Sequence, residues 1–217
     1  MLIDLHNHTL HLSTDSGLSL DALLSRAKER GLDGVCLTEH NALWKDMARL
    51  EDAAKRHGIA VFLGMEVNTH YGHTLVYGVQ SFRNSMLNFD ELCRVVESEG
   101  GLMVLAHPQW VGVGRKPSME IIGNHFHGIE VLNGEVSNET NDYVSAMAAT
   151  LGKFGTGGSD AHSPAAVGKC ATRFENPVTT TEEMVREMRA GRVSAVRLSA
   201  PGVNGAATVN GTSNGRH

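Results

Sequence analysis

Short apolar runs alternate with amphipathic segments along most of the chain. The amphipathic segments have the spacing of surface helices, and several begin at a capping residue such as Ser19 or Asn88. The alternation predicts an α/β fold in which helices connect a largely parallel sheet, with enough repeats to close a barrel. The expected strands are residues 3–5, 33–38, 59–63, 74–79, 102–106, 128–133, 154–159, 172–174 and 193–198, and the expected helices are residues 20–30, 44–57, 89–98, 118–123, 140–151 and 181–190.

Length and composition favour one globular domain. The chain has 217 residues and 41% hydrophobic content, and we expect the domain to span residues 1–200. Gly, Asn, Ala, Thr and Ser dominate residues 201–217, which are predicted to form a disordered tail. No apolar run is long enough to span a bilayer, and the net charge of −5 argues against an extended nucleic-acid surface. Isolated cysteines and the lack of a leader-like start lead us to expect a cytoplasmic protein.

Side chains that bind metals recur at the ends of the predicted strands. His6 and His8 lie one residue apart after the first apolar run, so both would project from the same side of a strand. Alone, this pair is equally well explained by two surface or half-buried histidines. Similar residues follow other strands, however, and a hairpin between residues 59–63 and 74–79 would bring His73 back toward Glu66. The candidate metal ligands are His6, His8, Asp15, His40, Glu66, His73, His107, Asp160 and His162.

This ligand set is larger than one tetrahedral or octahedral ion requires. We therefore predict two or three divalent ions of manganese, zinc or iron, with Glu66 as the natural bridge between them. Closely spaced cations can hold a hydroxide at neutral pH and neutralise phosphoryl oxygens, which is the chemistry of phosphoester hydrolysis. We expect Glu66, Asp160 and His107 to hold the metal-bound hydroxide, and an imidazole or a metal-bound water to protonate the leaving oxygen.

Several residues between the predicted strands could contact a substrate. Arg115 and Lys116 could clamp a phosphate or nucleotide, or they could be solvated loop charges. His11 could donate to a phosphate or lie exposed, and Trp110 could stack on a base or act as a hydrophobic plug.

Three further residues could lie near such a site. Glu130 is interpreted as a carboxylate that orients a ligand histidine, rather than as a ligand itself. His125 and His127 could reach the mouth of the active-site pocket, although a surface position is expected for at least one of them.

Six ordered motifs in the sequence resemble those of the polymerase and histidinol phosphatase (PHP) family. They are His6-x-His8-Thr9 with Asp15, Thr38-Glu39-His40, Gly64-Met65-Glu66, Ala106-His107-Pro108, Gly128-Ile129-Glu130 and Gly158-Ser159-Asp160-Ala161-His162. The resemblance implies a distorted (β/α)7 barrel of the PHP type and a trinuclear site. By this analogy one ion is held by His6, His8, Glu66 and Asp160, a second by Glu66, His73 and His107, and a third by Asp15, His40 and His162.

The resemblance also implies an activity. The element around His73 and the loop of residues 109–117 are more similar to the stand-alone nucleotide and RNA phosphoesterase branch than to the histidinol phosphatase branch. Glu39 departs from the family, which usually has Asp at this position. We expect a metal-dependent phosphoesterase acting on a small phosphomonoester or nucleotide. An exonuclease or cyclic phosphodiesterase is the alternative enzyme, and a metal-binding accessory PHP module is the alternative without catalysis.

Overall fold

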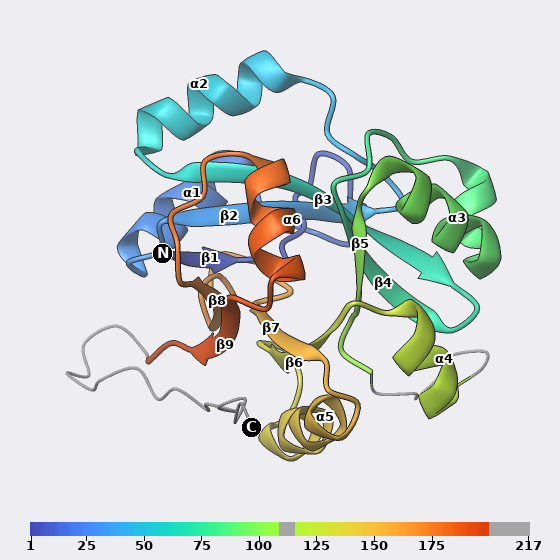
Figure 1. The fold of residues 1–217 in the computed structure, drawn as a ribbon. Helices are drawn as coiled ribbons and strands as arrows, with labels where there is room; N and C mark the ends of the chain where they lie inside the picture. The colour runs from blue at the N-terminus through green and yellow to red at the C-terminus, as the bar shows by residue number, and fades with distance from the viewer. Residues whose placement is uncertain (109–115, 200–217) are drawn as a thin grey trace.

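The computed structural model describes residues 1–108 and 116–199, and the predicted tail of residues 201–217 lies outside this part. Helices and strands alternate as the sequence pattern predicts (Figure 1). The strands are β1 (Leu2–Asp4), β2 (Gly34–His40), β3 (Ala60–Thr69), β4 (Gly72–Tyr77), β5 (Leu102–Leu105), β6 (Gly128–Asn133), β7 (Phe154–Gly158), β8 (Cys170–Phe174) and β9 (Val193–Arg197). The helices are α1 (Leu20–Glu29), α2 (Met47–His57), the 3-10 turn η1 (Asn84–Leu87), α3 (Phe89–Glu99), α4 (Met119–His125), α5 (Asn138–Thr150) and α6 (Thr181–Arg189).

The strands of the described residues form one sheet in the order β7-β6-β5-β4-β3-β2-β1-β8-β9. β1 pairs in parallel with β2, β2 with β3, β5 with β6, and β6 with β7. The parallel order is interrupted because β4 returns from β3 as an antiparallel hairpin, and β8 and β9 also run antiparallel to their neighbours. The strands therefore depart from a uniformly parallel arrangement, in the way that a distorted barrel of this type requires.

The sheet curves until its first and last parts nearly meet, so the expected barrel is confirmed. The Thr172 hydroxyl on β8 contacts the backbone N–H and C=O of Gly157 on β7, each at 2.9 Å. A side chain at Gly157 would bring a Cβ atom within 2.4 Å of the carbonyl oxygen of Ala171. Glycine is thus needed where the two strands approach one another.

Local capping explains where several helices begin. The hydroxyl of Ser19 accepts a hydrogen bond from the N–H of Ala22, and Asn88 caps α3 in the same manner, as predicted. The predicted start of α2 at Trp44 is wrong, because Asp46 is the cap and the helix begins at Met47. Trp44 instead lies buried ahead of the helix.

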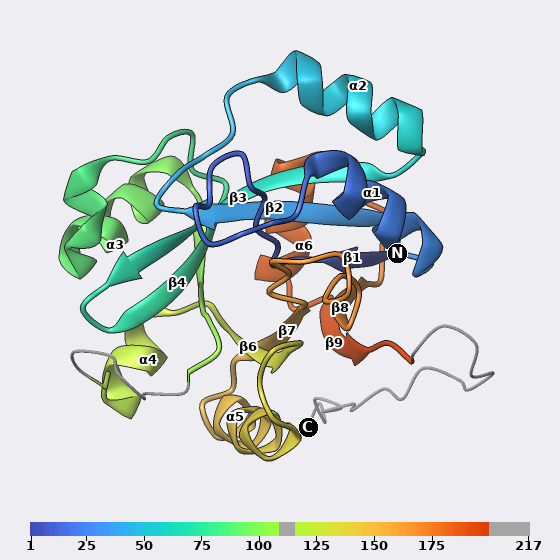
Figure 2. The ribbon, with the colours of Figure 1, turned by 180° about the vertical axis from the view of Figure 1, so that it is seen from behind.

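Apolar side chains fill the barrel and the spaces beneath the helices. Inside the barrel, Ile3, Phe62 and Tyr77 pack with Met184 and Met188 of α6. α6 and α1 lie on opposite faces of the strands β1 to β3 (Figures 1 and 2). In the described part of the chain, no helix is both long and apolar enough to cross a membrane.

Candidate metal centre

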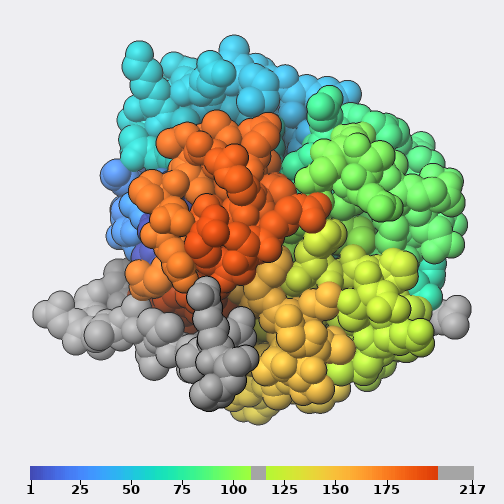
Figure 3. Space-filling view, viewed as in Figure 1, coloured from blue at the N-terminus to red at the C-terminus, as the bar shows by residue number. Residues whose placement is uncertain are grey.

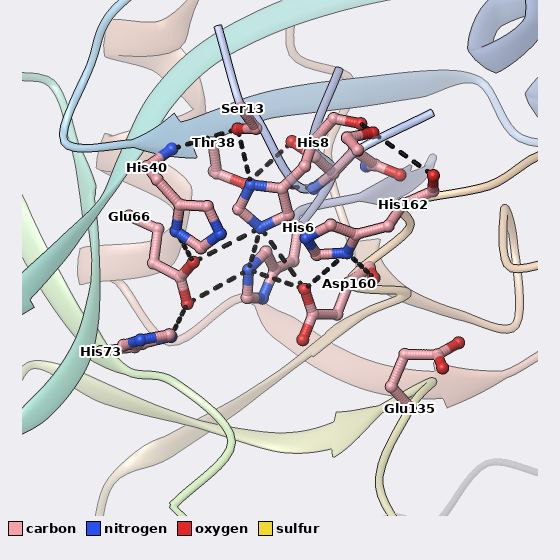
Figure 4. A network of polar contacts seen from close by, with 12 residues as sticks. His6, His8, Ser13, Thr38, His40, Glu66, His73, Glu135, Asp160 and His162 are labelled. Atoms are coloured by element: carbon pink, nitrogen blue, oxygen red, sulfur yellow. Dashed lines mark hydrogen bonds and ion pairs between the residues drawn. The ribbon is translucent and has the colours of Figure 1, made fainter. Parts of the chain in front are cut away.

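The predicted ligands converge at one end of the barrel (Figure 4). His6 and His8 follow β1, His40 is the last residue of β2, and His107 follows β5. Asp160 and His162 follow β7, and Asp15 lies in the loop before α1. These elements are distant in sequence, but the carboxyl ends of parallel strands meet at the same end of a barrel.

Glu66 and His73 lie inside strands rather than at or after the carboxyl end of one. The sequence pattern ends the third strand at Leu63, but the hairpin with β4 extends β3 to Thr69 and places Glu66 in its interior. In that hairpin Glu66 pairs with Leu75, and Asn68 pairs with His73. The predicted return of His73 toward Glu66 is found, since Nδ1 of His73 lies 2.8 Å from Oε1 of Glu66.

Glu66 is the centre of the cluster. Its carboxylate is fully buried, and its two oxygens face imidazoles from several different elements. Oε1 lies 3.0 Å from Nε2 of His107 and 3.5 Å from Nε2 of His6. Oε2 lies 2.8 Å from Nδ1 of His40 and 3.4 Å from Nε2 of His8. One carboxylate therefore lies among the donors of more than one prospective ion.

The hydrogen bonds of His6 and His8 define which ring nitrogens are available for a metal. When the imidazole of His6 is neutral and its Nδ1 donates to Oε1 of Glu130 at 2.9 Å, Nε2 keeps a lone pair that can bind a metal. Nδ1 of His8 lies 3.2 Å from Ser13 Oγ, whose proton is donated to Glu39, so Nε2 of His8 is also unprotonated. The two Nε2 atoms lie only 3.0 Å apart. Two lone pairs that face each other at this distance repel unless a proton or a metal ion lies between them.

Asp160, Asp15 and His162 complete the other side of the cluster. Oδ1 of Asp160 lies 3.4 Å from Nε2 of His6 and 3.3 Å from Nε2 of His8. Nδ1 of His162 bonds to the carbonyl oxygen of Asp160, so its Nε2 faces Oδ2 of Asp15 at 3.5 Å. Oδ2 of Asp15 is also 3.1 Å from Nε2 of His40.

Four overlapping triads within the described residues have ligand atoms close enough to share an ion. They are His6, His8 and Glu66; His6, His107 and Asp160; Glu66, His73 and His107; and His8, His40 and His162. All nine predicted ligands belong to one of these triads except Asp15, which contacts His40 and His162 of the last triad. Because the triads share members, ions held by two of them would lie close together.

The donor geometry fits divalent metals. With metal–ligand bonds near 2.1 Å, neighbouring ligand atoms are separated by about 3.0 Å at octahedral angles and about 3.4 Å at tetrahedral angles. The separations between Glu66 and its imidazole neighbours range from 2.8 to 3.5 Å. Moreover, Nδ1 of His40, Oε2 of Glu66 and Nδ1 of His73 are buried and lack an aligned hydrogen bond within the described residues. These atoms point into the cluster, as metal ligands would.

The electrostatics of the cluster keep its carboxylates ionised. Burial opposes the charge on Glu66, but the surrounding His6, His107 and His40 outweigh it and hold the pKa of Glu66 well below its usual range. Burial likewise opposes the charge on Asp160, and the histidines around it lower its pKa. Burial lowers the pKa of His8, which keeps this imidazole neutral and available as a ligand.

Glu130 and Asn133 support the ligands from β6. Glu130 is buried, and its Oε2 accepts hydrogen bonds from the N–H of His107 and the amide of Asn133, both at 3.0 Å. The same amide group of Asn133 lies 3.3 Å from Oδ2 of Asp160. Glu130 therefore lies where a carboxylate that orients ligands is expected: one oxygen bonds to the ring of His6 and the other to the backbone of His107.

No role was predicted for Glu39 from the sequence, although it belongs to the motif Thr38-Glu39-His40. Its buried carboxylate accepts hydrogen bonds from the N–H and hydroxyl of Thr9, from Oγ of Ser13 at 2.5 Å and from Nε1 of Trp44 at 2.8 Å. Because Ser13 also contacts Nδ1 of His8, Glu39 fixes the orientation of the His8 ring through this hydroxyl. The signal that could have identified it is a carboxylate in a buried strand immediately before a ligand.

No role was predicted for Asp4 from the sequence either. Its fully buried carboxylate accepts from the N–H groups of Ser159 at 2.8 Å and of His6 and Gly168 at 3.3 Å, and it thereby joins the ends of β1 and β7. Burial raises the pKa of Asp4 to about 6, despite these hydrogen bonds.

Backbone strain accompanies two ligands. His107 and Asp160 have φ values of 21° and 53°, which residues other than glycine rarely adopt. Such strain is common where a fold holds functional groups in a required orientation. Next to Asp160, a Cβ atom on Gly158 would approach Cβ of His6 to 2.4 Å and Oε1 of Glu130 to 2.7 Å. The close approach of β7 to β1 therefore depends on glycine.

The predicted substrate-binding residues have different outcomes. His11 stacks on Trp44 with a ring separation of 4.6 Å and lines a cavity of about 420 Å³ that also includes Asn41, the neighbour of His40. Lys116 is exposed ahead of α4, and Arg115 and Trp110 lie outside the described residues.

His125 and His127 do not reach the mouth of the active-site pocket, and the surface position expected for at least one of them is found for His125, which is exposed. His125 is the last residue of α4 and His127 immediately precedes β6, so both lie at the opposite end of the barrel. The reason is topological: a residue that precedes a parallel strand lies at the end where the strand starts, whereas most of the metal ligands lie at or beyond the carboxyl ends of their strands.

Comparison with known proteins identifies the family. Residues 4–168 match the PHP domain, which is about three quarters of the chain. The chain belongs to the PHP domain family. The match spans the motifs of this PHP domain from His6 to His162, so the family expected from the sequence is confirmed. No curated protein matches the sequence significantly.

Solved structures share the fold of this PHP domain. PsfC from Pseudomonas syringae PB-5123 is 23% identical with a TM-score of 0.67, and the match covers 91% of each chain. A two-domain protein from Bacteroides vulgatus ATCC 8482, described as containing a predicted PHP-like metal-dependent phosphoesterase, is 19% identical with a TM-score of 0.69, and the match covers 91% of this chain and 65% of that one. An amidohydrolase from Chromobacterium violaceum, with bound sulfate and no metal, is 19% identical with a TM-score of 0.63, over 90% of this chain and 97% of that one.

Proposed function

We propose that this PHP domain is a metal-dependent phosphoesterase that hydrolyses a small phosphomonoester or nucleotide in a trinuclear site. The observation that carries the proposal is the convergence of four overlapping ligand triads around the buried carboxylate of Glu66. The description of the Bacteroides vulgatus relative as a PHP-like metal-dependent phosphoesterase supports it. Sulfate bound to the Chromobacterium violaceum relative is also consistent, because sulfate is a tetrahedral oxyanion like phosphate.

The ligand geometry is compatible with the three ions that the family resemblance implies. The first ion would be held by His6, His8, Glu66 and Asp160, whose Oδ1 lies near both imidazoles. The second would be held by Glu66, His73 and His107, and the third by Asp15, His40 and His162. Divalent ions of manganese, zinc or iron would supply Lewis acidity, activating water near neutral pH and neutralising charge on the phosphoryl oxygens.

The protein's own contribution is to hold the ligand atoms in position. Glu130 fixes the ring of His6 and the backbone of His107, and Glu39 fixes the ring of His8 through Ser13. Because these supporting groups are buried, the ligands need little reorganisation when a substrate arrives.

The cavity beside His40 is suited to the organic part of the substrate. Its volume of about 420 Å³ is within the range of small-molecule pockets, and it combines the rings of His11, Trp44 and Phe82 with the cation of Lys45. A ring of the substrate could contact these aromatic groups while its phosphate lies at the ligand cluster. This size favours a small phosphorylated molecule or a single nucleotide over an exonuclease substrate.

The proposal is tested by elemental analysis of the purified protein and by phosphate release from a panel of phosphomonoesters, dinucleotides and cyclic nucleotides. We expect two or three metals per chain and free phosphate from at least one phosphomonoester. Fewer than two metals under replete conditions, with no release from any substrate, would refute the proposal. Products that keep a terminal phosphate would instead identify a phosphodiesterase or exonuclease.

Two variants separate catalysis from mere metal binding. His107→Ala and Asp160→Asn each remove a ligand and should abolish turnover, whereas Glu135→Gln removes a carboxylate that pairs with Lys169 and is drawn apart from the ligand network in Figure 4. Turnover that persisted in both ligand variants would contradict the catalytic assignment of the cluster even with metal bound. A metal-loaded parent protein without turnover on any substrate would instead indicate a metal-binding accessory module.

A further inference from the structure

A second cavity lies at the end of the barrel away from the metal ligands. Its volume is about 840 Å³, and it is lined by the end of α6 and the beginnings of β7 and β9. Phe154, at its wall, is the first residue of β7, and Asp160 lies two residues beyond the last, so the length of the strand, about 13 Å, separates the cavity from the ligand cluster. Figure 3 shows this face, where the orange-red surface of α6 and β9 meets the yellow-green surface of α4 to β7.

The charged groups of this cavity are all cationic. Lys153 and Arg189 line it, and no Asp or Glu is among its lining residues. Nζ of Lys153 donates to the carbonyl oxygen of Gly123 at 2.6 Å, and the guanidinium of Arg189 donates to the carbonyl oxygen of Gly101. Each contact is to a neutral carbonyl, and neither cation forms a salt bridge within the described residues. Two anchored but uncompensated cations thus face one cavity.

His127 adds an uncharged donor. Its Nδ1 accepts a hydrogen bond from the N–H of Met103 at 3.1 Å, so the ring proton is on Nε2. Burial, reinforced by Arg189 and Lys153, lowers the pKa of His127 to about 4. The ring is therefore neutral at physiological pH, and its depressed pKa reflects its burial first and the positive charges of Arg189 and Lys153 second.

We propose that this cavity, which we call the basal pocket and define by His127, Lys153, Phe154 and Arg189, binds a small phosphorylated organic molecule. The ammonium, the guanidinium and the imidazole N–H suit a phosphate, which presents several acceptor oxygens and a double negative charge. The volume exceeds what an inorganic phosphate fills and lies in the range of drug-sized ligands, so the ligand also has an organic part. The ring of Phe154 provides an apolar wall for that part.

This second site is independent of the reaction proposed for the metal centre. It uses none of the metal ligands, and it would exist whether or not the domain cleaves phosphoesters. Since β5, β6 and β7 start near the pocket and end near His107, Glu130 and Asp160, a ligand there contacts the same strands that deliver the metal site.

The test is an amide NMR titration of the zinc-loaded full chain, because zinc is diamagnetic and leaves signals near the metal site visible. The probe is the methylene phosphonate analogue of AMP, which a phosphoesterase cannot cleave, and adenosine is the uncharged comparison. We expect saturable shifts of the Gly152, Gly155 and Gly191 amides with the phosphonate and none with adenosine. Absence of these shifts at millimolar concentrations, or shifts confined to residues around Asp160, would overturn the proposal.

Charge variants then test which groups bind. The double variant Lys153→Gln/Arg189→Gln should weaken binding by about tenfold or more, and Lys153→Arg should largely preserve it. The matched control is Lys55→Gln/Arg186→Gln, which removes two exposed cations, one of them on the same helix α6. Unchanged affinity in the first double variant, with its spectrum showing a folded chain, would refute the assignment. A loss of affinity in the control of similar size would also refute it, because binding would then follow net charge alone.

Discussion

Nδ1 of His6 lies 2.9 Å from Oε1 of Glu130, and both side chains are shielded from solvent. The other oxygen of Glu130 accepts a hydrogen bond from the backbone of His107. One carboxylate on β6 therefore orients ligands that follow β1 and β5. This relationship makes the metal centre a property of the closed barrel, because no single element carries enough of it to bind an ion.

Glu130→Gln should lower metal affinity by about 10- to 100-fold, which is the usual effect of removing an outer carboxylate partner. The amide would present N–H groups where Glu130 now accepts from His6, His107 and Asn133. The measurement is the metal retained during dialysis against increasing chelator. Glu135→Gln is the matched control, and equal retention in both variants would contradict the role of Glu130.

Gly158→Ala should damage both stability and metal binding. The added Cβ would overlap Cβ of His6 and Oε1 of Glu130, and overpacking of this kind costs about 1–3 kcal/mol or more. Gly123→Ala is the control, because the nearest atom to its Cβ is 3.8 Å away and alanine in helix α4 should stabilise by about 0.5–1 kcal/mol. Urea denaturation measures both, and a stable Gly158→Ala variant with full metal content would show that β7 can move away from β1.

The hydrogen bond between Glu39 and Trp44 should be visible in a double-mutant cycle. Glu39→Asp shortens the carboxylate by one methylene and withdraws it from Nε1 of Trp44, whereas Trp44→Phe removes the donor. Each single variant should lose about 1–3 kcal/mol, because a buried charged group loses a partner. The double variant should lose less than the sum, by about 1 kcal/mol. Additive losses in urea denaturation would show that Asp at this position keeps the bond.

Metal stoichiometry should distinguish a shared ligand from a terminal one. Glu66 contacts His6, His8, His40, His73 and His107, so Glu66→Gln should remove more than one ion per chain. His73→Ala should remove one, because His73 belongs to a single ligand triad among the described residues. Elemental analysis of the two variants beside the parent protein provides the measurement. Loss of the same number of ions from both would contradict the bridging position of Glu66.

The ligands could be predicted from sequence because their placement is largely local. A histidine or carboxylate immediately after an apolar run is visible in the chain, and parallel strands bring such ends together whatever the details of packing. The position of Glu66 was partly misjudged, since the length of β3 depends on its pairing with β4 rather than on its own residues. Sequence periodicity does not report the pairing partner of a strand.

The supporting residues depend on contacts between distant segments. Asp4 bonds to the backbone of Ser159, which is 155 positions away, and Glu130 bonds to His6 across 124 positions. Nothing in the local pattern around Asp4 separates it from an ordinary polar residue in a short strand. The position of His127, in contrast, could have been inferred, because it precedes its strand and most of the metal ligands lie at or beyond the carboxyl ends of theirs.

The protonation of His127 should make stability depend on pH. Its pKa is lowered to about 4 by burial and by Arg189 and Lys153, whereas the unfolded chain has a value near 6.5. Between these values the unfolded state binds the extra proton, so stability is complete above about pH 6.5 and is lost as the pH falls toward 4. After allowance for the partial exposure of the ring, the loss should be about 1–2 kcal/mol. His127→Gln has no proton to gain there, and urea denaturation at several pH values should show the parent losing more stability than the variant over this window. Parallel pH profiles would mean that the ring is already solvated in the folded protein, and that Lys153 and Arg189 do not act on it.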